Sequence, residues 1–328
     1  MASILSIIII TKDTEQLLKS LLLSIEKDTS LKPYIQDIII IDNGSTDGTE
    51  VMIREKFPSL QYLKNNENKG FAASANMGIT RAKGDYLLFL NSDTRLIDGE
   101  VVKMLHFMEE HKDVGICGPQ LVFPDMRFQR SLAVVPSLLS ELLPQFLLIP
   151  GHQSPITNHR SPVTSHQSSI TSHCIIDVPS LIGAAILVRK SLLKRLGGFD
   201  EQFFFFLEET DLCLRARGMG QRVVFLPDVK VIHLQGQTVR KAWVKGRIEY
   251  NISLHKFIKK HHSLPYYILF QWIRFIKTSI FIICTTCLPF LLFNKKIRRS
   301  YSYYARLLLW SLSGYPDSFG LRSNRSRK

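Results

Sequence analysis

The sequence lacks the features that mark several large classes of protein. Its five cysteines are scattered without the spacing of a zinc site, and the single CxxC, Cys284 to Cys287, lies in an apolar run with no second pair nearby. The N-terminal stretch MASILSIIIITKD has no basic region, and no small-residue cleavage site follows its short apolar run. We therefore expect reduced thiols, no signal peptide and a main body in the cytosol.

Acidic residues are almost absent from the C-terminal quarter of the chain. From Arg240 to the end there are 18 of the 42 lysines and arginines but only two of the 28 acidic residues, Glu249 and Asp317. The net charge of +14 therefore belongs to this tail. Such asymmetry favours contact with anionic lipid or nucleic acid. The tail lacks the aromatic–basic alternation of an RNA-binding sheet, so we predict a membrane surface and no nucleic acid as its partner.

A long uncharged run is also missing from the tail. Between Lys277 and Asn294 lie sixteen uncharged residues, 278–293, which as a helix would span about 24 Å, short of a hydrocarbon core of ~30 Å. Basic residues flank both ends of the run: Arg274, Lys277, Lys295, Lys296, Arg298 and Arg299. The pattern favours a peripheral or monotopic helix over a clean span, with a buried soluble helix as the alternative.

Three tandem seven-residue copies, SPITNHR, SPVTSHQ and SSITSHC, occupy residues 154–174. They have no apolar face to bury and are too short for a solenoid. His159, His166 and His173 recur at the same step, so a metal site is one interpretation. We predict instead a disordered surface insertion at about 152–174 that grew by duplication.

The N-terminal part alternates between buried strands and amphipathic helices. Strands are predicted within 3–12, 36–49, 61–63 and 85–93, and helices within 14–27, 52–56 and 68–84, with Asp13 or Thr14 as the first cap. This order predicts an α/β fold with a mainly parallel sheet and right-handed crossovers. Further along we expect a strand and helix within 177–201, a helix that starts at an acidic cluster, and strand-like pieces at 222–226 and 229–233.

Polar residues follow the ends of these strands: Thr11-Lys12-Asp13, Asp42-Asn43-Gly44-Ser45, Asn91-Ser92-Asp93 and His233. The carboxyl ends of parallel strands share one edge, where open α/β sheets bind ligands. At this edge Asp42 can accept a hydrogen bond from a base N–H or a ribose hydroxyl. Asp93 can ligate a hard divalent cation that offsets the charge of a diphosphate. Each feature alone is also typical of an ordinary turn, and His233 also of a strand-end or core histidine.

Taken together, six segments resemble the family 2 glycosyltransferases with the GT-A fold. They are SIIIITKD, IIIIDNGSTDGT, NKGFAASANMGI, LLFLNSDT, GAAILVRKSLLKRLGGFDE and FFFFLEETDLCLRARGMG, in the family's order over about residues 3–240. The similarity is greatest to bacterial rhamnosyltransferase-like members that build surface polysaccharide. It implies a Rossmann-like, mainly parallel GT-A domain over residues 1–240. Residues 241–328 then form a basic, apolar, helical tail that associates with the membrane.

The resemblance implies roles for single residues. Those that match the nucleotide-binding positions are Thr11, Asp42, Asn68, Gly70, Asn76, Asn91 and Ser92. Asn91-Ser92-Asp93 matches the DXD motif, in which Asp93 would contact a Mg²⁺ or Mn²⁺ ion. Asn91 replaces the first Asp and leaves one ligand charge fewer. His233 matches a histidine that ligates metal in some relatives.

The acidic cluster Glu208-Glu209-Thr210-Asp211 matches the motif that supplies the catalytic base. That role falls on Glu209, with Glu208 and Asp211 as alternatives, while Gly183-Ala184-Ala185 matches the segment lining the acceptor side. Clustered carboxylates raise one another's pKa, which suits a base. A helix N-terminal cap is the other interpretation of the cluster.

The implied activity is inverting sugar transfer, with the metal stabilising the leaving nucleoside diphosphate. The donor would be a dTDP-, UDP- or GDP-sugar, with L-rhamnose as the candidate sugar, and the acceptor a lipid-linked or other glycan. The enzyme would act in cell-surface glycan synthesis at the cytoplasmic face of the bacterial inner membrane. Two alternatives stay open: a nucleotidyltransferase, although TKDTEQ lacks a glycine-rich basic phosphate loop, and a non-catalytic membrane- or nucleic-acid-binding protein.

Overall fold

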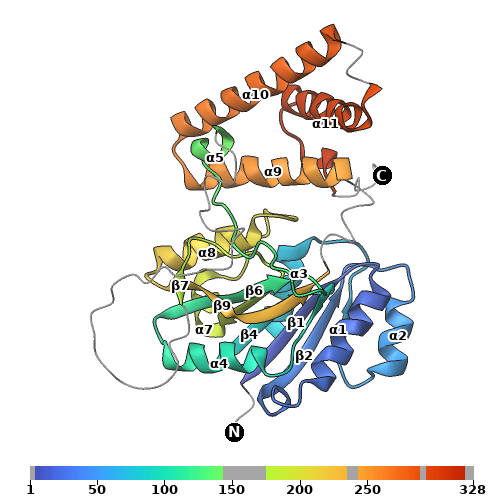
Figure 1. Ribbon diagram of the computed structural model, residues 1–328, viewed down its shortest axis with the longest axis vertical. Helices are drawn as coiled ribbons and strands as arrows, with labels where there is room; N and C mark the ends of the chain where they lie inside the picture. The colour runs from blue at the N-terminus through green and yellow to red at the C-terminus, as the bar shows by residue number, and fades with distance from the viewer. Residues whose placement is uncertain (1–3, 143–174, 235–242, 289–292, 322–328) are drawn as a thin grey trace.

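The computed structural model describes residues 4–142, 175–234, 243–288 and 293–321. Within these ranges the chain forms an α/β part up to residue 234, and long helices stand above it in Figure 1. The three heptad copies, with His159, His166 and His173, lie outside the described residues.

A nine-stranded sheet forms the centre of the α/β part. Its order is β3-β2-β1-β4-β8-β6-β9-β5, with β7 beside β9. The strands β3, β2, β1 and β4 are mutually parallel, as predicted, whereas β8 runs antiparallel to both β4 and β6. The strands are β1 (Leu5–Thr11), β2 (Ile35–Asp42), β3 (Gln61–Lys64), β4 (Tyr86–Asn91), β5 (Thr94–Arg95), β6 (Val114–Val122), β7 (Ile176–Asp177), β8 (Ala185–Arg189) and β9 (Arg222–His233).

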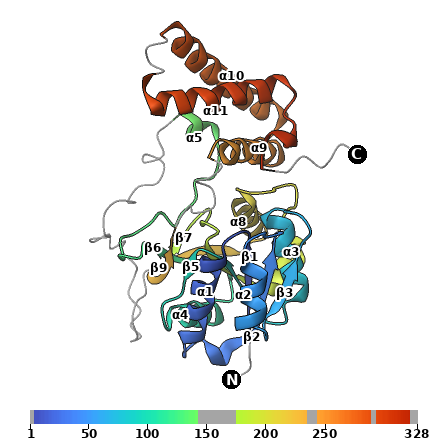
Figure 2. The ribbon, with the colours of Figure 1, turned by 90° about the vertical axis from the view of Figure 1, so that its right-hand side faces the viewer.

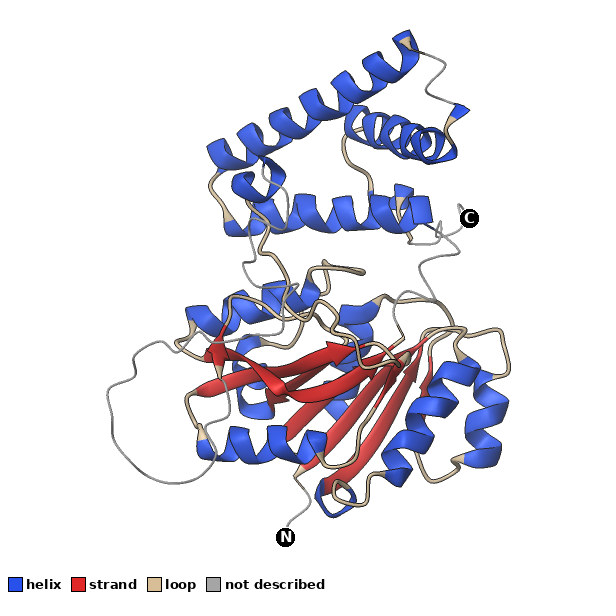
Figure 3. Ribbon diagram, in the orientation of Figure 1, coloured by secondary structure: helices blue, strands red, loops and turns tan. Residues whose placement is uncertain are grey.

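Helices cover both faces of the sheet (Figure 3). One face packs against α1 (Glu15–Lys27), α2 (Thr49–Lys56) and α4 (Glu100–Glu110), and the other against α3 (Phe71–Arg81), α7 (Lys190–Leu196) and α8 (Glu208–Gly218). Alternate residues of β1 serve the two faces, Ile7 and Ile9 on one and Ile8 on the other. Because both faces are buried, the strand reads as a continuous apolar run rather than an alternating one.

Two expectations about local structure need correction. The strand-like pieces at 222–226 and 229–233 are one strand, β9, which is interrupted by a bulge: Leu226 pairs with Pro119 of β6, and Lys230 pairs with the next residue, Gln120. At the start of α1, Thr14 is the N-cap residue but its hydroxyl does not cap the helix. The carboxylate of Asp47 accepts the Glu15 N–H instead, at 3.1 Å.

Three long helices follow the α/β part: α9 (Trp243–His261), α10 (Leu264–Cys287) and α11 (Lys295–Leu312). The short helix α5 (Leu138–Leu142) lies among them in both views (Figures 1 and 2). Among the described residues, η1 (Lys32–Tyr34) and η4 (Asp317–Phe319) are 3-10 helices. Buried Phe257 of α9 and Phe270 of α10 pack with Phe203 and Leu207, which precede α8, so these helices dock directly above the start of α8.

The boundaries predicted for the apolar helix of the tail are wrong. The helix covers Leu264–Cys287 rather than 278–293 and includes Arg274 and Lys277. It ends just before Leu288, because residue 289 is proline, which cannot continue the hydrogen-bond ladder. At about 1.5 Å per residue its 24 residues extend about 36 Å, so by length and composition it is long enough to cross a membrane.

Candidate active site

The polar ends of β1 and β4 lie side by side at one edge of the sheet, as the topology predicts. The hydroxyls of Thr11 and Thr14 are 2.7 Å apart, and the Thr14 hydroxyl donates to Ser92 Oγ at 2.9 Å. All three residues are buried. This chain of hydroxyls links the end of β1 to the turn after β4, and so fixes the segment Asn91–Asp93 next to Thr11.

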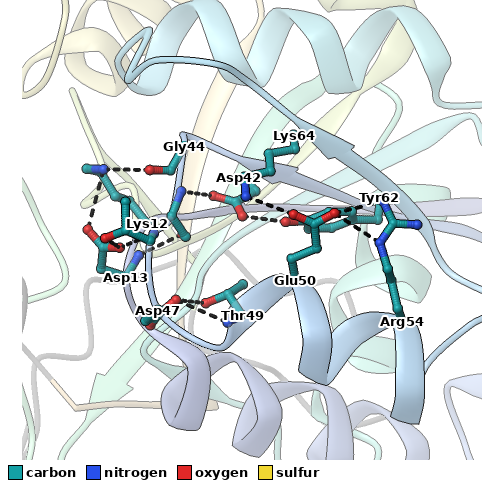
Figure 4. Close-up of polar contacts among 12 residues, drawn as sticks. Lys12, Asp13, Asp42, Gly44, Asp47, Thr49, Glu50, Arg54, Tyr62 and Lys64 are labelled. Carbon is teal, nitrogen blue, oxygen red and sulfur yellow. Dashed lines mark hydrogen bonds and ion pairs between the residues drawn. The ribbon is translucent and has the colours of Figure 1, made fainter.

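Asp42 is completely buried at the end of β2 (Figure 4). Its carboxylate accepts hydrogen bonds from the Ser45 N–H, at 2.8 Å, and from the hydroxyl of Tyr62 on β3. Burial and the contact with Asp42 raise the pKa of Tyr62, so the phenol remains a donor. Both oxygens of Asp42 thus have internal partners, and a nucleoside contacting this carboxylate would replace one of them or share it.

Asn43, which sequence reasoning did not single out, organises the loop before α3. Its Nδ2 donates to the Gly70 carbonyl at 3.1 Å, and its Oδ1 accepts from Asn65 Nδ2 at 3.0 Å and from Ser74 Oγ at 2.6 Å. An asparagine directly after Asp42 could have been interpreted as a residue that organises the site, but asparagine is also common in ordinary turns. Asn43 therefore connects the end of β2 to the predicted residue Gly70.

Gly70 and Asn68 form a tight turn at the start of α3. The Asn68 side-chain oxygen accepts the Gly70 N–H at 2.9 Å. Gly70 has φ +85°, and a Cβ at this position would lie 2.3 Å from the Phe204 carbonyl oxygen. Only glycine fits this conformation and this contact. The close approach here is therefore to another part of the chain, Phe204.

Asn76 lies apart from the other predicted nucleotide residues. Its Nδ2 donates to the Phe199 carbonyl and to Glu201 Oε1, each at 2.9 Å, while its Oδ1 accepts the Phe199 N–H at 2.8 Å. The amide thus holds α3 to the segment after α7. None of these contacts involves a residue at the edge where Asp42 and Asp93 lie.

The two predicted metal ligands, Asp93 and His233, are neighbours. Asp93 Oδ1 lies 3.4 Å from His233 Nε2. The pair is held in place because Thr94 of β5 is paired with His233 of β9 in antiparallel register. Both side chains are almost buried, with 12% and 11% of their surfaces exposed.

Gln129 fixes the orientation of the His233 ring. Its Nε2 donates to the His233 carbonyl, and its Oε1 lies 3.1 Å from His233 Nδ1. Because the amide nitrogen is already used, Oε1 faces the ring as an acceptor and Nδ1 carries the hydrogen. His233 Nε2 then points at the Asp93 carboxylate. Sequence reasoning missed Gln129, and its distance of 104 residues from His233 leaves no local signal.

This donor set fits a divalent cation. A carboxylate oxygen and an imidazole nitrogen that face each other at 3.4 Å can share a divalent cation or, without one, a proton. A hydrogen-bond partner on the second ring nitrogen is typical of metal-ligating histidines. Across the described ranges no group of three or more His, Cys, Asp and Glu residues forms a metal cluster. A cation held by this pair would therefore keep positions open for oxygens of a diphosphate.

The acidic cluster begins α8 after a strained backbone. Phe206 and Leu207 have φ of +74° and +68°, a region that bulky residues rarely adopt. Buried Glu208 and half-buried Glu209 follow in the first turn of the helix. The Oε2 atoms of both side chains are buried and have no hydrogen-bond partner among the described residues.

The pKa of Glu209 is higher in the folded protein than in water. Burial raises the pKa of Glu209, and backbone N–H groups, including that of Gly183, offset part of this effect. Burial and the adjacent charge of Glu209 raise the pKa of Glu208 well above its usual range. A Cβ on Gly183 would lie 3.3 Å from the Glu209 side chain, so a larger residue there would make the Glu209 side chain shift by a few tenths of an ångström.

Asp211 differs from its two neighbours because two cations and a histidine surround it. Its carboxylate lies 2.7 Å from Arg215, 2.6 Å from Lys260 and 2.7 Å from His261. Burial alone would raise the pKa of Asp211, but these three partners lower it to about 2. Since Lys260 and His261 belong to α9, the group joins α8 to the C-terminal helices.

A cleft of about 710 Å³ lies between the start of α8 and the C-terminal helices. The α/β part contributes Arg130, Ile182 and Glu209 to its walls, and the C-terminal helices contribute residues such as Tyr250 and Tyr303. Glu209 thus borders a space large enough for a sugar-sized substrate.

Comparison with known proteins places this geometry in a family. The profile described as Glycosyl transferase family 2 matches residues 6–196. The N-acetylglucosaminyl-diphospho-decaprenol L-rhamnosyltransferase of Mycobacterium tuberculosis is 25% identical over 260 residues, which cover 76% of this chain and 80% of that protein. The dTDP-rhamnosyl transferase RfbF of Shigella flexneri is 25% identical over 243 residues, which cover 72% of this chain and 71% of that protein.

Solved structures show the same fold at low sequence identity. The mannosyltransferase PcManGT from Pyrobaculum calidifontis, in complex with GDP-Man and Mn²⁺, has a TM-score of 0.53 at 14% identity and covers 95% of this chain and 86% of that chain. GalNAc-T7 with UDP, GalNAc and Mn²⁺ has a TM-score of 0.56 at 14% identity and covers 78% of this chain and 48% of that chain. The family match decides against a nucleotidyltransferase and against a non-catalytic binding protein. The chain belongs to glycosyl transferase family 2, has the GT-A fold, and is a glycosyltransferase similar to bacterial rhamnosyltransferases.

Proposed function

We propose that the enzyme transfers L-rhamnose from dTDP-L-rhamnose, with inversion, to a lipid-linked diphosphate acceptor in cell-surface glycan synthesis. The observation that carries the proposal is Glu209, a carboxylate with a raised pKa and an unpartnered oxygen that lines the cleft. The choice of sugar and acceptor is supported by the relatives in Mycobacterium tuberculosis and Shigella flexneri.

Asp93 and His233 would hold a Mg²⁺ or Mn²⁺ ion on the donor side, and Gln129 would orient His233. When bound, the cation neutralises negative charge on the departing diphosphate. The nucleoside end of the donor would lie along Thr11, Asp42, Asn91 and Ser92. Asn68, Gly70 and Asn76 would act by shaping the loop and helix beside the nucleotide, since their polar groups bond to the chain itself.

Glu209 would act as the general base. It would take the proton from the acceptor hydroxyl as that oxygen attacks the anomeric carbon. The new glycosidic C–O bond forms while the bond to the diphosphate breaks, and its electron pair leaves with the nucleoside diphosphate. A single base with no second nucleophile gives inversion. Glu208, whose pKa is raised further, would stay protonated beside the base, and Asp211 would be structural.

The helices within residues 241–328 would rest on the cytoplasmic face of the membrane. Most of the apolar side chains along one stripe of α10 are exposed: Ile268, Trp272, Ile276, Ile280 and Ile283. They recur at every third or fourth residue, as in helices that lie in a membrane interface. Exposed Lys295, Arg298 and Arg299 at the start of α11 would attract anionic headgroups.

Release of nucleoside diphosphate from a panel of dTDP-, UDP- and GDP-sugars tests the proposal. We expect release from dTDP-L-rhamnose that needs a polyprenyl-diphosphate-linked sugar acceptor and stops when EDTA removes divalent cations. Equal turnover in EDTA would remove the metal from the mechanism. Turnover with another donor only would overturn the choice of sugar.

A further inference from the structure

The cleft beside Glu209 is lined by an excess of basic side chains. Among the described residues that line it, four are cationic, Arg130, Arg247, Arg274 and Lys277, and two are acidic, Glu209 and Glu141. The cations come from separate parts of the chain: Arg130 from the segment after β6, Arg247 from α9, and Arg274 and Lys277 from α10. None of the predicted donor-side residues Asp42, Asp93 and His233 lines this cleft.

The contacts of Glu141 show that two of these cations, Arg274 and Lys277, bind carboxylate oxygens. The Glu141 carboxylate accepts from Arg274, and its Oε2 lies 3.4 Å from Lys277 Nζ. Arg274 also donates to Asn251 Oδ1. Arginine and lysine at one site can hold a phosphate by charge-assisted hydrogen bonds, and a diphosphate carries more charge than a single carboxylate.

The arrangement of the cleft follows the chemistry of a lipid-linked sugar. Glu209 lies on the α/β part, where the acceptor hydroxyl must arrive. The cationic side chains of α9 and α10 face the same cleft. The exposed apolar stripe with Trp272, Ile276 and Ile280 lies on α10 itself. A lipid-linked sugar carries a sugar, a diphosphate and an isoprenoid in that order. These groups match Glu209, the cationic side chains and the apolar stripe of α10, respectively.

We infer that Arg130, Arg247, Arg274 and Lys277 form the binding site for the diphosphate of an isoprenoid-diphosphate-linked acceptor. The inference rests on the proposed function for the identity of the acceptor but concerns a separate site, distinct from the metal-dependent donor site. In the absence of the acceptor, the Glu141 carboxylate contacts Arg274 and Lys277 in place of the diphosphate oxygens, and the acceptor displaces it on binding.

Binding of farnesyl diphosphate to the full-length protein in detergent, measured by calorimetry in EDTA, tests the inference without any transfer reaction. We expect saturable binding that weakens at least tenfold in Arg247→Gln and in Lys277→Gln. Lys277 is half-exposed, so its substitution leaves folding intact. Arg298→Gln is the matched control, because Arg298 is an exposed cation of the same tail that does not line the cleft. It should change affinity less than twofold.

Glu141→Gln supplies a test with the opposite sign. Removing the competing charge should tighten farnesyl diphosphate binding several-fold, whereas a purely structural role for the Glu141–Arg274 pair predicts weaker binding or none. Inorganic pyrophosphate should bind more weakly than farnesyl diphosphate and respond to the same variants. Equal binding of the two would show a general phosphate site rather than a lipid headgroup site.

Two results would overturn the inference. One is farnesyl diphosphate binding that neither Arg247→Gln nor Lys277→Gln weakens. The other is binding that disappears in Asp93→Ala, because that would place the ligand in the donor site. Failure of the proposed sugar transfer leaves these binding results unchanged, so the two proposals fail separately.

Discussion

The Gln129→Leu substitution is the sharpest test of how the metal site is held. Gln129 Oε1 lies 3.1 Å from His233 Nδ1, and Gln129 Nε2 donates to the His233 carbonyl. Leucine fills a similar volume but makes neither bond, so the ring loses the contact that keeps Nε2 turned toward Asp93. Loss of such an outer contact typically lowers metal affinity 10- to 100-fold, which corresponds to about 1.4 to 2.7 kcal/mol.

Titration of Mn²⁺ followed by electron paramagnetic resonance of the free ion measures this affinity, with and without nucleoside diphosphate. Gln129→Glu is the matched variant, because it retains an acceptor for Nδ1–H while it loses the donor to the carbonyl and adds a negative charge. We expect wild type and Gln129→Glu both to bind Mn²⁺ more tightly than Gln129→Leu. Unchanged Mn²⁺ affinity in Gln129→Leu, with a correctly folded protein, would refute the role of His233 as an oriented ligand.

Three further outcomes follow from the geometry. Gly70→Ala should lower the free energy of unfolding by about 3 kcal/mol, because the Cβ would meet the Phe204 carbonyl at 2.3 Å with φ at +85°. Gly197→Ala, with φ of +73° but nothing within 4 Å, should cost roughly 1 kcal/mol, and urea denaturation distinguishes the two. Glu209→Gln should lower kcat about 10²- to 10⁴-fold at unchanged donor KM, and steady-state kinetics that show full turnover would place the base elsewhere. The lowered pKa of Asp211, about 2 against a usual 3.8, should contribute roughly 2 kcal/mol of stability above about pH 4. This contribution is lost as the pH falls toward about 2, and acid unfolding of Asp211→Asn, which should begin from a lower stability, should lack that part of the pH dependence.

The central sheet and its ligand edge were predictable because they depend on local pattern. Continuous apolar runs mark strands buried on both faces, and the order of strands and helices predicts parallel pairing. Parallel pairing then places the ends of β1, β2 and β4 at one edge, where Thr11, Asp42 and Asp93 lie. The pairing of Asp93 with His233 was expected only from resemblance, and the register of β5 with β9 accounts for it.

The remaining features depend on contacts between distant parts of the chain. Gln129 and His233 are hydrogen-bonded although 104 residues separate them in the sequence, and Asp211 and His261 are hydrogen-bonded across 50 residues. No local sequence pattern predicts either bond. Asp211 looked equivalent to Glu208 and Glu209 in the sequence, but Arg215, Lys260 and His261 from two helices set it apart. The limits of α10 were misjudged because charge was used to bound the helix, whereas a helix can contain Arg274 and Lys277 when they face a polar cleft.

The central claim is that Asp93 and His233 hold a cation that contacts the diphosphate of the donor. Anomalous diffraction from crystals grown with Mn²⁺ and dTDP-L-rhamnose or dTDP tests it most directly. We expect one manganese peak coordinated by Asp93 and His233 Nε2 and by oxygens of the diphosphate. A diphosphate bound with no metal at Asp93, or a manganese peak at another site, would contradict it.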